Sequence, residues 1–91
     1  MTAAERFGQN LRSRRRSLNL SQEALALRAG LHRTEIGMLE HGQRTPRIDT
    51  LVKVVGALEA DADELLAGIE WVPVRTGGGV LRVSEDQQSG S

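Results

Sequence analysis

The amino-acid sequence predicts an all-α domain of five short helices, followed by a C-terminal β-hairpin extension. Up to Gly68, apolar residues recur every three or four positions, which is the period of one helix face. After Gly68 the pattern changes to two β-prone runs separated by glycines. A chain of 91 residues is long enough for one domain with one modest core. We therefore expect a helical domain at residues 3–68, a hairpin at 69–83 and a disordered polar tail at 84–91.

The first helix is expected at about residues 3–18. Phe7, Leu11 and Leu18 are spaced four and seven positions apart, so they share one face of this helix. Asn19 is the predicted stop.

The second and third helices form a closely spaced pair. Ser21 is the predicted N-cap of the second helix, and Gly30 is expected just past its end in a left-handed conformation. The third helix is predicted at about residues 33–40 and stops near Gly42. A polar loop containing glycine and proline follows it.

A fourth helix is expected at about residues 48–58, with apolar residues at helical spacing at Ile48, Leu51, Val52, Val55 and Leu58. Asp61 and Glu64 have the spacing of a capping box for a very short fifth helix, which holds Leu65 and Leu66 and closes at Gly68.

The hairpin is expected to pair residues 69–74 with residues 80–83 around a loop at residues 75–79. Pro73 cannot donate a hydrogen bond to a neighbouring strand, so its strand is expected at an edge. Trp71 either pins the hairpin to the helical domain or anchors a subunit interface.

The net charge is zero, but the charges are unevenly distributed. Residues 1–20 carry five Arg and one Glu, a net charge of +4, whereas residues 48–70 have a net charge of −5. This asymmetry is typical of a basic binding face with an acidic opposite pole. The chain has no cysteine, no signal-peptide pattern and no apolar run of membrane-spanning length, so we expect a cytoplasmic protein away from membranes.

Residues 22–41 carry the spacing of a helix-turn-helix unit. Ala26 provides a small side chain where the two helices cross, and Gly30 provides the turn. The positions expected to be buried are all uncharged: Leu25, Ala29, Leu31, Ile36 and Leu39. A charge in this set would cost several kcal/mol, about what an unpaired buried group costs.

Four segments carry a resemblance to a known family: LSQEALA at residues 20–26, AGLHRTEI at 29–36, LEHG at 39–42 and PRIDTL at 46–51. They resemble the lambda-repressor-like, or Xre, helix-turn-helix family of phage repressors, Cro proteins and restriction-modification controller proteins. The resemblance covers about residues 5–68. It implies a five-helix domain that binds double-stranded DNA, with its third helix in the major groove.

The resemblance also implies the site residues. The outward positions of the third helix, expected to read bases, are Arg33, Thr34, Glu35 and Met38. The positions expected to contact the DNA backbone are Gln22, Arg44, Thr45 and Arg47. Arg15 and Glu40 match the positions of a buried or half-buried ion pair in the family, which implies a structural role.

Other residues leave alternatives open. The run of Arg14, Arg15 and Arg16 is either a solvated helix face or includes one phosphate contact. His32 and His41 lie at opposite ends of the third helix without metal-site spacing, so we expect no metal, no cofactor and no enzymatic activity.

We expect a transcriptional regulator, a repressor or an autoregulator, that acts as a homodimer on a palindromic operator. Its dimerisation is expected to use the fifth helix and the hairpin, whose edge can pair with that of its mate. The alternative is an antitoxin or adaptor that also binds a partner protein through Leu27, Met38 and the hairpin as exposed apolar features.

Overall fold

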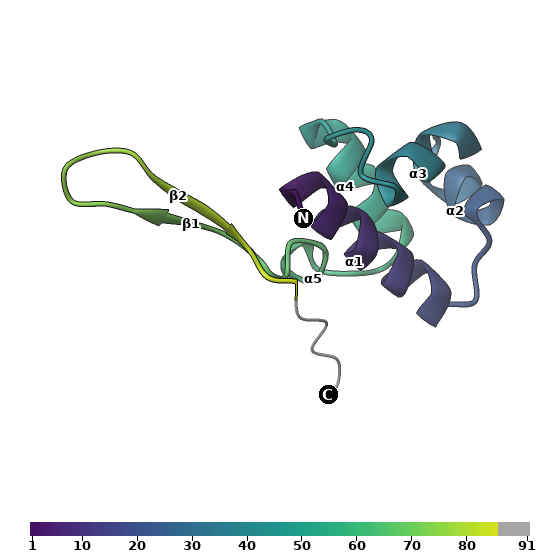
Figure 1. Cartoon of the computed structure of the whole chain (residues 1–91). Helices are drawn as coiled ribbons and strands as arrows, with labels where there is room; N and C mark the ends of the chain where they lie inside the picture. The colour runs from purple at the N-terminus through teal and green to yellow at the C-terminus, as the bar shows by residue number, and fades with distance from the viewer. Residues whose placement is uncertain (86–91) are drawn as a thin grey trace.

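The computed structural model describes residues 1–85 and places five helices beside a two-stranded antiparallel hairpin (Figure 1). The helices are α1 (Ala3–Ser17), α2 (Gln22–Ala29), α3 (Arg33–Glu40), α4 (Ile48–Ala57) and α5 (Ala62–Leu65). The strands are β1 (Ile69–Pro73) and β2 (Gly79–Val83). The predicted order of elements is therefore confirmed. None of the described helices is long and apolar enough to cross a membrane.

Local capping explains where the first helices begin and end. Thr2 and Glu5 form a reciprocal capping box at the start of α1, which the sequence analysis did not identify. Asn19 follows the end of α1 as predicted and is left-handed with φ of 59°, which was not predicted; Gly30 is left-handed with φ of 70°, as predicted. The Ser21 hydroxyl accepts a hydrogen bond from the Ala24 amide at 2.9 Å, so the predicted N-cap is confirmed.

The predicted capping box of α5 is wrong. Asp61 is the N-cap residue, but its side chain makes no capping hydrogen bond. The Glu64 amide donates instead to the backbone carbonyl of Asp61 at 3.0 Å, which closes a tight turn without the carboxylate. The Glu64 carboxylate lies 3.8 Å from the Arg14 guanidinium, so it faces α1 rather than its own N-cap.

The core lies between the helices, and its fully or nearly buried apolar residues are Phe7, Leu11, Leu25, Ala26, Ala29, Ile36, Leu39, Val54, Ala57, Leu58 and Leu65. The predicted buried face of α4 is partly wrong, because Ile48 and Val52 are 74% and 62% exposed. Thr50, Val54 and Ala57 are the buried residues of that helix. Since α4 is apolar around much of its circumference, its sequence alone did not decide which face the core would cover.

Helices α1 and α3 cross at Gly8. A Cβ atom at this position would overlap the backbone carbonyl oxygens of Leu39 and Glu40 at the end of α3. Gly37 on α3 differs, since a Cβ there would meet only the Gln22 Oε1 at 4.0 Å. Gly8 therefore allows the close approach of the two helices, and Gly37 does not serve such a contact.

A buried ion pair joins the same two helices near the C-terminal end of α1. The Arg15 Nε donates to the Glu40 Oε2 at 2.6 Å and its Nη2 to the Oε1 at 3.0 Å. The Glu40 side chain is only 2% exposed, and the hydrogen bonds from Arg15 raise the pKa of that guanidinium above its usual value. Arg15 also donates to the Leu20 carbonyl at 2.7 Å, and Gln22 donates to Glu40 at 3.0 Å. The ion pair expected from the resemblance is present, and it fixes α1, α2 and α3 together.

The hairpin projects away from the helices (Figure 1). Its strands pair Ile69 with Val83 and Pro73 with Gly79, so Gly79 belongs to a strand rather than to the predicted loop. Trp71 is 58% exposed, and its indole lies against Gly79, where a Cβ would come within 2.7 Å of the ring. The prediction that Trp71 pins the hairpin to the helical domain is wrong, because Ile69 makes that contact with the core instead.

Polar contacts hold both ends of the hairpin to α1. Arg6 is 7% exposed and donates to the Ala67 carbonyl at 3.1 Å and to the Ser84 carbonyl at 2.9 Å. The Ser84 amide donates to Gly68 at 2.7 Å, and the terminal amine of Met1 lies 2.8 Å from a Glu85 carboxylate oxygen. Of the predicted disordered tail, Ser84 therefore contacts Arg6 on α1 and Glu85 contacts Met1, which precedes that helix, and residues 86–91 lie outside the described residues.

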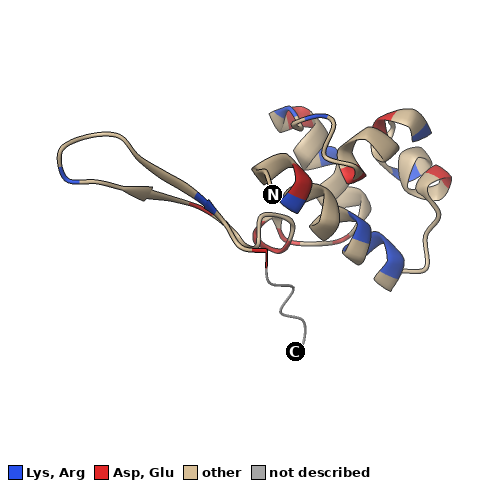
Figure 2. Ribbon diagram, viewed as in Figure 1, with Lys and Arg blue, Asp and Glu red and all other residues tan. Residues whose placement is uncertain are grey.

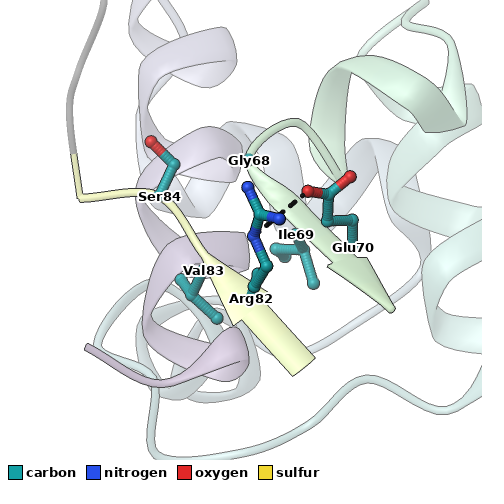
Figure 3. Close-up of a pocket in the computed structure, with 6 residues that line it drawn as sticks. All are labelled: Gly68, Ile69, Glu70, Arg82, Val83 and Ser84. Atoms are coloured by element: carbon teal, nitrogen blue, oxygen red, sulfur yellow. Dashed lines mark ion pairs between the residues drawn. The ribbon is translucent and has the colours of Figure 1, made fainter. Parts of the chain in front are cut away.

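An open cavity of about 570 Å³ lies at this base, lined by Gly68, Ile69, Glu70, Arg82, Val83 and Ser84 (Figure 3). Glu70 and Arg82 face each other across the strands at 3.5 Å. Both side chains are more than half exposed, so this pair contributes little to stability.

We predict that Gly8→Ala destabilises the domain by roughly 1–3 kcal/mol or more, because the α3 carbonyls cannot withdraw without moving the helix. The matched control, Gly37→Ala, should stabilise the domain by up to about 1 kcal/mol, since alanine favours helix and the site is open. Urea unfolding followed by circular dichroism measures both effects. Similar midpoints for the two variants would contradict the close crossing at Gly8.

We also predict that Glu40→Ala costs roughly 3–5 kcal/mol of unfolding free energy, because it leaves the buried Arg15 guanidinium without its partner. Arg28→Ala is the control, since it removes an ion pair with Glu59 in which both side chains are exposed. That change should cost less than about 1 kcal/mol. If Glu40→Ala cost no more than the control, the ion pair would not hold the helices together.

Candidate nucleic-acid interface

Helices α2 and α3 meet through the short turn that the spacing predicts. Ala26 is 4% exposed at the crossing, and the Leu31 amide donates to its carbonyl at 2.9 Å around Gly30. Ile36 and Leu39 are fully buried on the inner side of α3. This packing orients α3 so that Arg33 and Thr34 lie at the surface.

The four predicted base-reading residues differ in exposure. Arg33 and Thr34 are exposed in the first turn of α3, and neither is held by a neighbouring side chain in the described residues. Glu35 and Met38 are half-buried, so the expectation that Met38 is an exposed apolar residue is wrong. These positions are half-buried because α3 packs against both α1 and α2, which leaves it a narrow free face.

The four predicted backbone-contacting residues lie at the start of α2 and in the loop that follows α3. Gln22 is the first residue of α2 and is half-buried against Glu40. Arg44, Thr45 and Arg47 are exposed in the loop between α3 and α4. The Arg47 side chain is 86% exposed and lies 3.8 Å from Asp49.

The arginines of α1 do not form one basic face. Arg6 and Arg15 are buried, and Arg14 donates to the Leu58 carbonyl at 3.1 Å and to the Glu59 carbonyl at 2.9 Å, beyond the end of α4. Only Arg12 and Arg16 remain exposed among the α1 arginines. Figure 2 shows the basic residues of the domain spread over the C-terminal part of α1, the ends of the other helices and the loop before α4. Most of the arginines in residues 1–20 therefore make contacts within the fold. They do not form the basic binding face that was inferred from their charge.

The roles of Arg6 and Arg14 were missed by the sequence analysis. The carbonyl groups that accept from Arg6 lie 61 and 78 positions away, and those that accept from Arg14 lie 44 and 45 positions away. No local pattern signals such contacts. Within residues 1–85, no cluster of three or more His, Cys, Asp or Glu side chains is arranged to hold a metal ion.

An apolar surface lies apart from α3. Ile48, Val52 and Leu66 are 74%, 62% and 40% exposed. An apolar cavity of about 240 Å³ lies nearby, lined by Ala3, Ala4, Phe7, Thr45, Pro46, Leu51, Leu66 and Ile69. Contiguous apolar surface of this kind is typical of a protein contact rather than of a nucleic-acid contact.

Comparison with known proteins agrees with this geometry. Residues 11–65 match the family model described as helix-turn-helix. Control protein C.SmaI of Serratia marcescens is 42% identical over 66 residues, which cover 72% of this chain and 79% of that protein. The crystal structure of the restriction-modification controller protein C.AhdI from Aeromonas hydrophila aligns with a TM-score of 0.67 and 40% identity, covering 68% of this chain and 94% of that one.

A phage repressor is similar over the same part of the chain. The P22 c2 repressor, solved in complex with a synthetic operator, aligns with a TM-score of 0.64 and 31% identity, covering 68% of this chain and 94% of that one. The family model spans more than half of the chain, and the relatives share both its sequence and its arrangement of helices. The chain belongs to the helix-turn-helix family of DNA-binding transcription regulators, together with restriction-modification controller proteins and phage repressors.

Proposed function

We propose that this protein is a sequence-specific regulator of transcription, a repressor or an autoregulator, that acts as a homodimer on a palindromic operator and catalyses no reaction. The observation that carries the proposal is the presentation of α3. Arg33 and Thr34 are exposed at its start, exposed arginines follow its end, and the buried Arg15–Glu40 pair holds it in place. This is the arrangement that a helix needs to enter the major groove and be fixed there by phosphate contacts.

Base reading is assigned to the free face of α3. The Arg33 guanidinium can donate two hydrogen bonds to the O6 and N7 of guanine, and Thr34 can contact a base edge or a thymine methyl group. Glu35 can accept from the N4 of cytosine, and Met38 offers apolar contact to a thymine methyl group. Because Glu35 and Met38 are half-buried, Arg33 and Thr34 contribute most of the sequence preference.

Phosphate contacts are assigned to the residues beside α3. Arg44, Thr45 and Arg47 are exposed and supply cationic and hydroxyl donors. Gln22 gives one amide hydrogen to Glu40, which orients the amide and leaves its second hydrogen for a phosphate oxygen. Arg16 provides a further exposed cation on α1.

We infer the homodimer from the small number of base pairs that one domain can read. One domain of this kind reads about four or five base pairs, which is too few to select one site in a genome. Two copies related by a two-fold axis would read half-sites about 10 base pairs apart. The hairpin and the exposed apolar residues beside α5 are the surfaces we assign to the contact between copies.

The antitoxin or adaptor function remains the alternative. It requires an apolar surface for a partner protein, and Leu27 on α2 is 84% exposed. Met38, the second residue proposed for that surface, is half-buried. Only part of the expected surface is therefore available, so we favour the plain regulator.

We predict that Arg33→Ala and Arg47→Ala weaken DNA binding in different ways. Arg33→Ala should cost roughly 1–3 kcal/mol on the operator and relax preference at one position, whereas Arg47→Ala should weaken all duplexes about equally and lower the salt slope by about one. Binding titrations on operator and unrelated duplexes at several salt concentrations separate the two effects.

The control is Arg28→Ala, which removes an arginine that pairs with Glu59 at the far end of α2. It should leave operator preference unchanged. Duplex binding that neither Arg33→Ala nor Arg47→Ala affects would show that the surface assigned to DNA is wrong.

We predict that a fragment of residues 1–68 folds but binds the operator less tightly than the full chain. All buried apolar core residues lie at or before Leu65, so the fragment keeps its core. It loses the hairpin and should be monomeric by light scattering. A fragment that remained dimeric would show that the hairpin is not needed for the contact between copies.

A further inference from the structure

The hairpin is a two-stranded sheet with two outer edges. The Ser84 amide donates to the Gly68 carbonyl, and the Val74 amide donates to the Gly78 carbonyl, at the two ends of the ladder. Since antiparallel pairing alternates along a strand, the even-numbered residues of β1 and β2 exchange hydrogen bonds within the hairpin. The backbone groups of the odd-numbered residues therefore point outward, toward the free edges.

The outer edge of β1 is poorly suited to accept another strand. Its outward positions are Ile69, Trp71 and Pro73. The Ile69 amide already donates to the Leu66 carbonyl at 3.1 Å, and Pro73 has no amide hydrogen. Only Trp71 keeps a donor on this edge, so a continuous ladder cannot form along β1.

The outer edge of β2 is open. Its outward positions are Gly79, Leu81 and Val83, each with an amide hydrogen and a carbonyl group. Within residues 1–85, these outward groups have no hydrogen-bond partner. Leu81 is 54% exposed and the Arg82 side chain is 64% exposed, so the middle of the strand is accessible, whereas Gly79 and Val83 at its ends are half-buried. Such an edge is a template for pairing with another strand.

We propose that β2 pairs antiparallel with β2 of a second copy, about a two-fold axis that passes beside Leu81. This inference rests on the homodimer of the proposed function and identifies the surface that joins the two copies. The two hairpins then form one four-stranded sheet in the order β1-β2-β2-β1. A two-fold axis makes the same edge serve both copies, which is the simplest closed assembly.

The register follows from counting donors and charges. With Leu81 opposite Leu81 of the second copy, Gly79 lies opposite Val83, and all three outward positions of each strand are paired. A register centred on Val80 would leave the Val83 groups opposite the turn. A register centred on Arg82 would place two arginines directly opposite each other, which is unfavourable. The register centred on Leu81 therefore forms the most hydrogen bonds without opposing like charges, since Arg82 then faces Val80.

The side chains of the hairpin also favour a second copy. Trp71 and Leu81 are paired across the strands, share one face and are both more than half exposed. A lone two-stranded hairpin is only marginally stable in water, whereas a sheet of four strands with an apolar face can be stable by itself. Pairing through β2 brings the Trp71 and Leu81 faces of both copies into one apolar surface beside the axis.

Single cysteine variants of the full chain test the pairing, because the natural sequence has no cysteine. Residues in a hydrogen-bonded antiparallel pair have Cα atoms about 5.5 Å apart, within the range of a disulfide. Leu81→Cys should therefore form a disulfide-linked dimer under mild oxidation. Val80→Cys and Arg82→Cys should each remain unlinked alone, because each lies opposite the other position, and should link to one another when the two variants are mixed. Circular dichroism verifies that every variant keeps the helical domain.

Light scattering of the unsubstituted protein separates failure of this inference from failure of the homodimer. A dimeric protein whose Leu81→Cys variant does not link would overturn the β2 pairing and leave the homodimer standing, held by another surface such as that of Ile48 and Val52. Linking of Val80→Cys or Arg82→Cys alone would overturn the register, and linking of Trp71→Cys in place of Leu81→Cys would overturn the choice of strand. A monomeric protein would overturn both proposals, and recovery of a different protein paired with this edge would overturn the β2 pairing.

Discussion

The buried pair of Arg15 and Glu40 is the interaction on which the position of α3 depends. Glu40 is the last residue of that helix, and its carboxylate receives donors from Arg15 on α1 and Gln22 on α2. Desolvating this carboxylate is costly, and the hydrogen bonds offset the cost only while all three helices keep their places. The pair therefore selects one relative arrangement of the helices, and Gly8 permits the close crossing that this arrangement requires.

Arginine has two separate uses in this chain. Arg6, Arg14 and Arg15 donate to backbone carbonyls or to a carboxylate inside the molecule, where the planar guanidinium satisfies several acceptors at once. Arg33, Arg44 and Arg47 extend into solvent around α3. A net charge calculated from the sequence adds both groups together. The exposed positions of cations, rather than their number, indicate where a nucleic acid would bind.

The hairpin lies outside residues 11–65, the part of the chain that the family model covers. Arg6 ties both ends of the hairpin to the helical domain, yet the hairpin projects away from the helices (Figure 1). Trp71 and Leu81, in the middle of its strands, are exposed. An edge strand left open in this way tends to associate, and proteins usually block such edges. Here Pro73 interrupts one edge and nothing in the sequence of β2 interrupts the other. Only the β2 edge can therefore pair with another strand. A single open edge favours one specific partner, because further strands cannot add at the other edge.

The sequence by itself determined the features that depend on neighbouring residues. The order of helices, the stop at Asn19, the left-handed Gly30 and the Ser21 cap were all predictable, because a few adjacent residues decide each of them. The family resemblance extended this to the Arg15–Glu40 pair. Only the tertiary structure decided which face of α4 is buried, where Arg6 and Arg14 donate, and that Trp71 lies on Gly79. Those outcomes depend on segments far apart in the chain, whose approach is set by packing of the whole domain and leaves no local pattern.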